Sequence, residues 1–311
     1  MFSKAPLFIS PKELQELRSS SNVAILDASW HMPTSPRKAA EGFLAKRIPG
    51  ARFFSVDDVA SPHELGLKHM LPTPQIFAEA VEKLGITPSS RVVLYDSSGV
   101  FSSPRGLFTF KALGHENASI LNGGLPRWEA EGLPTESGPV SDVAKSVYPP
   151  PTVNEGVIRS YAQVVSNSAF DLSTQPTAEL VLDARPHGRF TGQDPEPRPG
   201  LESGHVPHSF SLPFNTFLKT NAVPGSTATY TTLLSPDELR QVLVRTVGEE
   251  HARQIVEGKR PVITTCGSGM TAAVLWLGLN LISDSTQVAL YDESWTGYAS
   301  RAESRIDKGE N

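Results

Sequence analysis

The sequence predicts an α/β protein of two similar domains, each a parallel sheet with helices on both faces. Three observations carry this prediction. Several short patterns occur twice in the same order, and short apolar runs alternate with helical segments in both copies. A stretch rich in proline and serine separates the copies. We therefore place the first domain at residues 1–140, an extended linker at 141–156 and the second domain at 157–311.

The repeated pattern begins with a short apolar strand ending in Asp-Ala, at Ala24–Ala28 and again at Leu180–Ala184. A second apolar strand leads into Asp-Ser-Ser-Gly after Val92–Tyr95 and into Cys-Gly-Ser-Gly after Val262–Thr265. Such buried apolar runs are typical of parallel strands covered on both faces. The matching order predicts that the two copies share one topology.

Helical segments fill the intervals between these strands. They include Pro74–Gly85, Pro236–Val247 and the apolar run Ala272–Ile282. Near the end of each copy, Asn-Gly-Gly before Trp128 is echoed by Tyr-Asp-Glu before Trp295. Because parallel strands need crossover connections, strands that alternate with helices predict a parallel sheet in each copy.

The composition is that of an ordinary globular chain, with 39% apolar and 20% charged residues and a formal net charge of −5. This charge argues against a nucleic-acid or membrane partner and favours a small ligand. One cysteine and eight scattered histidines show no metal-ligand spacing, so we expect neither metal nor cofactor. Without a signal peptide or presequence, we expect the cytoplasm, with the mitochondrion as a further compartment.

Cys266 is the only cysteine, and it opens the run Cys-Gly-Ser-Gly-Met-Thr between a β-branched strand and an apolar helix. Backbone N–H groups in such a loop form an anion nest that stabilises a thiolate. A free cysteine at a strand end is more often a buried small hydrophobe. The two glycines and the serine leave the backbone uncovered, which a packing role does not require. We therefore interpret Cys266 as a nucleophile.

Asp96 stands in the first copy where Cys266 stands in the second. A carboxylate cannot hold a transferable sulfur atom, so thiol chemistry is confined to the second copy. We predict that the first domain is catalytically silent.

Two arginines lie on a proline-stiffened loop that follows the Asp-Ala-Arg strand end at Arg185. Because arginine pairs with carboxylates through two parallel hydrogen bonds, Arg189 and Arg198 could together hold an α-keto acid. Surface arginines in polar loops are more often solvated or ion-paired. For Arg185 we expect a structural ion pair with a nearby carboxylate.

Taken together, these residues resemble the tandem-domain rhodanese-type sulfurtransferases, whose second domain carries the active cysteine and whose first domain is silent. The loop is similar to the Cys-Gly-Ser-Gly-Val-Thr of 3-mercaptopyruvate sulfurtransferases, whereas thiosulfate sulfurtransferases carry Cys-Arg-Lys-Gly-Val-Thr. It departs from the former at Met270, which alters the pocket shape but not the N–H donors. The resemblance implies substrate contacts at Gly267, Gly269, Met270 and Thr271.

The charge of the loop agrees with this assignment. Thiosulfate is a compact dianion that benefits from cationic side chains at the loop, and positions 267–270 supply none. Mercaptopyruvate has a carboxylate at a distance from its sulfur, which calls for a cation displaced from the thiol. The resemblance identifies Arg189 and Arg198 with the substrate-binding arginines of the mercaptopyruvate group.

The resemblance also implies a proton relay formed by Ser268, His69 and Asp57 beside the nucleophile. Taken alone, His69 would be a solvated loop histidine and Asp57 a helix N-cap. The implied relay brings residues of the first copy to the second copy's loop.

The implied reaction moves sulfur from 3-mercaptopyruvate through a Cys266 persulfide to a thiol, cyanide or a protein acceptor, releasing pyruvate. Because the chain has no second cysteine, the acceptor must come from outside, and a small thiol or a thioredoxin-like protein is expected.

Four alternatives stay open. Two keep the Cys266 chemistry: a thiosulfate:cyanide sulfurtransferase, and a sulfur-relay protein serving tRNA thiolation or sulfur-carrier activation. A cysteine-dependent phosphatase is disfavoured because Ala272 stands where its phosphate loop needs an arginine. A non-catalytic interaction module is disfavoured by the intact cysteine loop.

Overall fold

The computed structural model describes residues 5–18, 20, 22–170, 175 and 177–310. The chain forms two compact units, and each contains residues from both halves of the sequence. The first unit extends to Ser61 and adds Leu71–Asn154 and Leu218–Leu233; the second contains Pro62–Met70, Glu155–Phe217 and the chain from Leu234 on. The domain bounds at 140 and 157 stay a prediction. Two segments lie in the unit formed mainly by the other half of the sequence: Pro62–Met70 belongs to the second unit and Leu218–Leu233 to the first.

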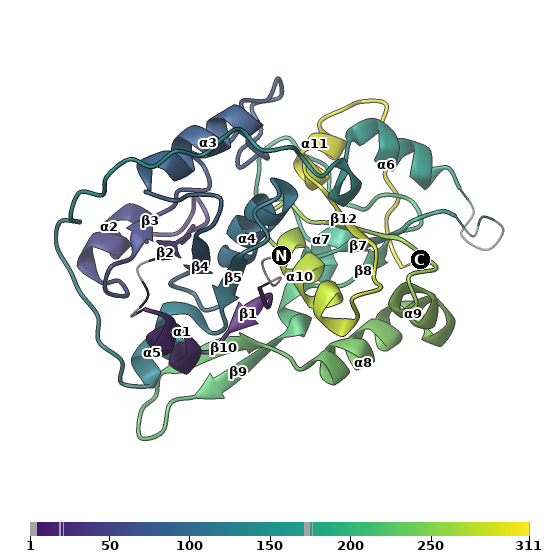
Figure 1. The fold of residues 1–311 in the computed structure, drawn as a ribbon. Coiled ribbons are helices and arrows are strands. Elements are labelled where there is room, and N and C mark those ends of the chain that lie inside the picture. Colours follow the sequence, from purple (N-terminus) through teal and green to yellow (C-terminus); the bar gives the residue numbers. More distant parts are fainter. Residues whose placement is uncertain (1–4, 19, 21, 171–174, 176, 311) are drawn as a thin grey trace. The chain divides into compact units, whose positions relative to one another are not determined.

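The first unit contains a five-stranded sheet with the order β1-β5-β4-β2-β3 and all neighbours parallel (Figure 1). Five helices connect or flank these strands. The strands are β1 Phe8–Ile9, β2 Val23–Asp27, β3 Arg52–Phe53, β4 Arg91–Tyr95 and β5 Ala118–Leu121; the helices are α1 Pro11–Leu17, α2 Ala39–Ala45, α3 Pro74–Lys83, α4 Ser103–Ala112 and α5 Gly124–Ala130.

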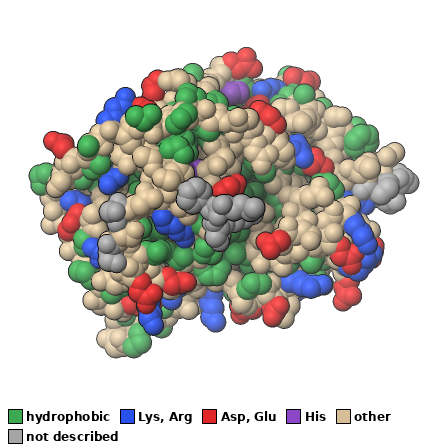
Figure 2. All heavy atoms as spheres, in the orientation of Figure 1, with side chains coloured by type: hydrophobic (Ala, Val, Ile, Leu, Met, Phe, Trp, Pro, Cys, Tyr) green, Lys and Arg blue, Asp and Glu red, His purple; other side chains and the backbone are tan. Residues whose placement is uncertain are grey.

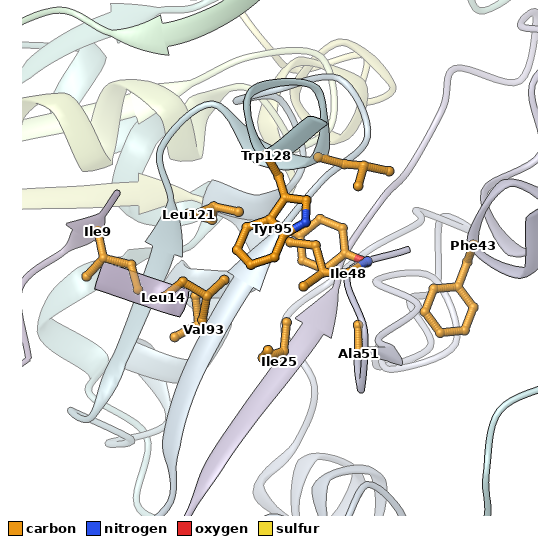
Figure 3. Packing of buried hydrophobic residues seen from close by; sticks show 11 residues of the cluster. Ile9, Leu14, Ile25, Phe43, Ile48, Ala51, Val93, Tyr95, Leu121 and Trp128 are labelled. Atoms are coloured by element: carbon orange, nitrogen blue, oxygen red, sulfur yellow. The ribbon is translucent and has the colours of Figure 1, made fainter. Parts of the chain in front are cut away.

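Side chains that alternate along β4 pack against helices on the two faces of this sheet. Val93 and Tyr95 belong to a cluster with residues of α1, α2 and α5 (Figure 3). On the other face, a Cβ at Gly106 of α4 would lie 2.6 Å from a methyl group of Leu94, so this helix packs closely on the strand. Full burial on both faces explains why Val92–Tyr95, the part of β4 after Arg91, is an uninterrupted apolar run.

The second unit repeats this sheet in the order β6-β12-β11-β7-β8, again with parallel neighbours. The predicted class, two α/β domains with parallel sheets flanked by helices, is therefore confirmed. The strands are β6 Ile158–Arg159, β7 Leu180–Asp183, β8 Phe210–Ser211, β11 Val262–Thr265 and β12 Val288–Tyr291; the helices are α6 Tyr161–Ser168, α7 His187–Thr191, α8 Pro236–Val247, α9 Glu249–Val256, α10 Ala272–Ile282 and α11 Ser294–Ala299, with short 3₁₀ turns at Glu155–Val157 and Phe214–Phe217.

Local signals set the helix ends. At the start of α8, the Ser235 hydroxyl accepts the N–H of Glu238, whose side chain accepts the Ser235 N–H in return. The predicted bounds of α8 and α10 are confirmed, while α3 ends at Lys83, two residues earlier than predicted. Gly85 follows with a φ of +64°, a conformation that favours glycine after a helix end.

Matching hydrogen bonds align the two copies. The N–H of Leu125 donates to the Asp96 carbonyl at 3.0 Å, and the N–H of Trp295 donates to the Cys266 carbonyl at 2.8 Å. Asp96 and Cys266 are therefore structurally equivalent. Trp295 corresponds to Leu125 and not to Trp128, so the pairing of the two tryptophans suggested by the sequence is wrong.

A hairpin from the second half of the sequence completes the first unit. Strands β9 (Leu218–Ala222) and β10 (Thr229–Leu233) pair antiparallel. The N–H of Leu233 donates to the Asn122 side-chain carbonyl at 3.0 Å, and the Thr231 hydroxyl donates to the Ser98 carbonyl at 3.3 Å. This hairpin therefore packs against the loop that begins at Asp96.

Charged side chains of both signs are interspersed on the face of the molecule that Figure 2 shows. In the part of the chain that the structure describes, no helix is long and apolar enough to span a bilayer.

Candidate active site

Cys266 lies at the carboxyl end of β11, where α/β sheets place their ligands. Its side chain is buried, with 2% of the residue exposed. Its N–H donates to the Ser294 hydroxyl at 3.2 Å, and its carbonyl accepts the Trp295 N–H. The start of α11 thus fixes the backbone on both sides of the thiol.

The next residues keep the loop tightly curled. The Gly267 carbonyl accepts the N–H of Thr296 at 3.0 Å and its hydroxyl at 2.5 Å. Gly269 has a φ of +80°, a region that side chains strongly disfavour. Met270 is buried, and Thr271 precedes the first residue of α10. The glycines therefore serve the loop conformation as well as access to its backbone.

In the first unit, the equivalent loop is filled by its own carboxylate. Asp96 is 1% exposed, and its two oxygens accept five hydrogen bonds between them. One oxygen accepts the Ser98 N–H at 2.9 Å. The other accepts the N–H groups of Phe101, Ser102 and Ser103 at 2.9, 3.1 and 2.9 Å and the Ser103 hydroxyl at 2.7 Å. The loop is an anion nest whose anion is part of the chain.

The corresponding donors in the second unit face a thiol instead. The N–H groups of Ser268, Thr271 and Ala272 occupy the positions of Ser98, Phe101 and Ser102. None of the three has a hydrogen-bond acceptor among the residues that the structure describes. This loop therefore retains unused donors for an anion at Cys266.

The two predicted arginines converge on this loop. A Cβ placed on Gly267 would lie 3.2 Å from Nη2 of Arg189 and 3.5 Å from Nη1 of Arg198. The structure thus brings both guanidinium groups to the residue that follows the cysteine. A side chain longer than that of alanine at position 267 would displace them.

A buried carboxylate that the sequence analysis did not single out holds one of these arginines. Glu196 has a side chain that is 1% exposed. Its carboxylate accepts hydrogen bonds from Nη1 of Arg185 at 2.8 Å and from Nε of Arg189 at 3.0 Å. It also contacts Nη2 of Arg189. Arg185 additionally pairs with Asp183 at 2.5 Å, which confirms its predicted structural ion pair. The available signal for Glu196 was its place between prolines, two residues before Arg198.

Arg198 differs from Arg189 in its pairing. It is half-buried and makes no ion pair with any carboxylate in the described residues. It lines a cavity of about 490 Å³ together with Gln193, Asp194 and Leu201. Its charge is therefore less neutralised than that of Arg189.

His69 lies in the second unit, because the segment Pro62–Met70 belongs there. Its Nε2 lies 3.2 Å from the Ser268 hydroxyl, and the residue is 3% exposed with a φ of +53°. The structure therefore brings His69 and Ser268 together. Asp57 belongs to the first unit, where its carboxylate accepts the Trp30 indole N–H at 2.9 Å.

Comparisons with known proteins agree with this architecture. The Rhodanese-like domain family matches residues 10–131. The chain is 36% identical over 307 residues to the probable 3-mercaptopyruvate sulfurtransferase of Schizosaccharomyces pombe, covering 97% of this chain and 96% of that protein. It is 34% identical over 315 residues to the thiosulfate sulfurtransferase of Rattus norvegicus, covering 97% and 96%.

A solved structure shows the same fold. The sub-stoichiometric sulfur transferase subunit of yeast mitochondrial complex I matches with a TM-score of 0.80 and 33% identity, covering 99% of this chain and 100% of that one. The predicted enzyme class is confirmed by these relatives, which share the fold over nearly the whole chain. The chain therefore belongs to the tandem-domain rhodanese-type sulfurtransferases, enzymes that transfer sulfur.

Proposed function

We propose that this sulfurtransferase takes sulfur from 3-mercaptopyruvate through a persulfide on Cys266 and passes it to an outside thiol. The observation that carries the proposal is the approach of Arg189 and Arg198 to Gly267 beside a loop with no charged side chain. Relatives named for either donor match the chain about equally, so overall identity does not separate them.

The arginines suit a donor whose negative charge is remote from its sulfur. The carboxylate of mercaptopyruvate would pair with Arg198, which lacks a carboxylate partner in the described residues, and with Arg189, which Glu196 orients. The donor sulfur would then lie against the Cys266 thiolate. We assign further contacts with the donor to Gly267, Gly269, Met270 and Thr271.

In the first half-reaction, the Cys266 thiolate attacks the sulfur of mercaptopyruvate and forms an S–S bond. The C–S bond breaks, and its electron pair remains on carbon as the enolate of pyruvate. The proton of the donor thiol passes to that carbon, which releases pyruvate and leaves the persulfide as an anion. The N–H groups of Ser268, Thr271 and Ala272 would stabilise the persulfide anion.

We assign proton handling to Ser268 and His69, whose side chains lie 3.2 Å apart. Asp57 is proposed to orient the imidazole of His69, as the third member of the relay. These three roles are part of the proposal and are tested by their own substitutions.

In the second half-reaction, an acceptor thiolate attacks the outer sulfur, and the S–S bond breaks to regenerate the Cys266 thiolate. A small thiol or a thioredoxin-like protein fits this step, and cyanide would serve in an assay. We propose the cytoplasm and the mitochondrion as its compartments, which microscopy of a tagged full-length chain would test.

The first experiment loads the purified protein with each donor separately. We expect pyruvate release and a gain of one sulfur atom on the Cys266 peptide with mercaptopyruvate, and neither product from Cys266→Ser. Loading by thiosulfate alone would refute the donor assignment, and loading by neither donor would favour a relay fed by another protein.

Arg198→Ala sharpens this test. We expect the KM for mercaptopyruvate to rise at least about tenfold, because a charge-assisted hydrogen bond is lost. Transfer from an already loaded Cys266 persulfide should stay unchanged. Arg305→Ala is the matched control, since Arg305 is an exposed arginine that pairs with Asp307.

A further inference from the structure

The first unit contains a cavity of about 470 Å³ that the sulfur chemistry leaves unused. Its lining includes His31, Arg37 and Lys38 from the chain after β2, Ser97 from the loop after β4, and Leu125 of α5. These positions follow the carboxyl ends of parallel strands, the edge at which α/β sheets bind ligands. We call it the first-unit cavity.

The internal repeat relates this cavity to the site of the second unit. Ser97 follows Asp96 as Gly267 follows Cys266. Nη2 of Arg37 donates to the Ser97 carbonyl at 3.1 Å and to its hydroxyl at 3.0 Å. A guanidinium group therefore stands at the same loop position in both units, although the nucleophile is present in one alone.

The charges around the first-unit cavity favour an anion. Lys46 and Glu129 pair at 2.6 Å and offset each other. Of the remaining charged side chains that line the cavity, the two cations Arg37 and Lys38 outnumber the one anion, Glu41. Nε and Nη1 of Arg37 have no hydrogen-bond partner among the described residues. Asp96 does not offset Arg37 through a direct bond, because five donors of its own loop already surround its oxygens.

The rest of the lining fits a short carbon chain. Leu125, Pro126, Pro36 and Ala45 supply apolar surface beside the cations. Burial and the neighbouring Arg37 lower the pKa of His31, so its imidazole is neutral at neutral pH and can donate one hydrogen bond and accept another. A small molecule with one carboxylate and a second polar oxygen would meet both kinds of surface.

We propose that the first-unit cavity binds a small organic carboxylate with a second polar oxygen on Arg37, without reacting with it. Arg37 pairs with the carboxylate through its free edge, and Leu125 and Pro126 cover the carbon chain. No covalent step follows, because Asp96 replaces the thiol. The site is a binding site separate from the sulfur-transfer loop.

The test uses pyruvate as the probe and the full chain carrying Cys266→Ser and Arg198→Ala, which weaken binding in the second unit. We expect saturable binding in saturation-transfer NMR of the pyruvate methyl signal, at least about tenfold weaker after Arg37→Gln. Arg245→Gln is the matched control, because Arg245 is exposed and makes no ion pair with any described residue. Hydrogen exchange should show protection of residues 31–46 on binding.

Absence of saturable binding, or binding that Arg37→Gln leaves unchanged, would overturn the proposal. Equal competition by sulfate would overturn the carboxylate assignment. Lys38→Gln provides a second variant in which a weaker loss is expected, since Lys38 lines the same cavity. Sulfur loading of Cys266 in the otherwise unchanged chain reports the proposed function independently and should be unaffected by Arg37→Gln.

Discussion

At the residue scale, Gly267 explains how the arginines reach the thiol loop. A Cβ at position 267 would already press on the end of Arg189 and touch that of Arg198, so a larger side chain would displace both guanidinium groups. The sequence indicated Cys266 and the loop glycines because these form a local pattern, whereas the family resemblance singled out both arginines. Glu196 escaped notice because its role depends on burial between Arg185 and Arg189, which no short motif encodes.

Gly267→Arg should therefore impair use of mercaptopyruvate. The new guanidinium would lie among those of Arg189 and Arg198 and repel them, so we expect kcat/KM for mercaptopyruvate to fall at least about tenfold. Gly267→Ala is the graded control: its Cβ needs a small shift of the flexible end of Arg189 and lies at ordinary contact distance from Arg198, so a smaller loss follows. Steady-state pyruvate release measures both. Equal losses in the two variants would contradict the charge argument.

At the element scale, the two equivalent loops have similar backbones but different roles. In the first unit the donors are occupied by Asp96, and in the second the donors at Ser268, Thr271 and Ala272 remain available beside Cys266. The sequence predicted that the first copy is silent from the carboxylate alone. It could not predict the hydrogen bonds, because they depend on how the loop curls.

Asp96→Ala should destabilise the first unit. Several buried N–H groups would lose their acceptor, and we expect the free energy of unfolding to fall by at least about 3 kcal/mol. Urea denaturation followed by tryptophan fluorescence measures this, with Trp30 and Trp128 as reporters in the first unit. Asp142→Ala, at an exposed position, is the control and should change little. A loss below about 1 kcal/mol would show that water satisfies the loop donors.

At the scale of the whole molecule, the repeat made the fold class predictable. The sequence did not predict that each half contributes a segment to the other unit. The placement of Pro62–Met70 and Leu218–Leu233 depends on contacts with residues distant in sequence. Periodicity carries no such information. A hairpin that covers the silent loop could therefore not be predicted from the sequence.

Two buried groups of the first unit have opposite effects on how stability depends on pH. Burial raises the pKa of Asp27 to about 6 and lowers the pKa of His115 to about 4. Between about pH 4 and 6, the folded chain keeps a proton on Asp27 that the unfolded chain releases, so this group lowers stability as pH rises. His115 does the reverse, because the unfolded chain binds the proton there. The two contributions nearly cancel.

Asp27→Asn should reveal the contribution of His115. The free energy of unfolding should then rise with pH, relative to the unsubstituted chain, by about 1.4 kcal/mol per pH unit between about pH 4 and 6. Urea denaturation at several pH values in that range measures the slope. His115→Gln is the converse variant and should change the slope with the opposite sign. Parallel curves for Asp27→Asn and the unsubstituted chain would refute the assignment.

The hairpin of β9 and β10 also affects how the first unit folds during synthesis. Leu218–Leu233 leaves the ribosome about 80 residues after Asn154, which at about 5–20 residues per second means a delay of about 4–16 s. During that interval the Asn122 side chain and the Ser98 carbonyl lack the partners that Leu233 and Thr231 later provide. The first unit therefore remains without its hairpin during this interval. A chaperone that binds the nascent chain would have its largest effect then.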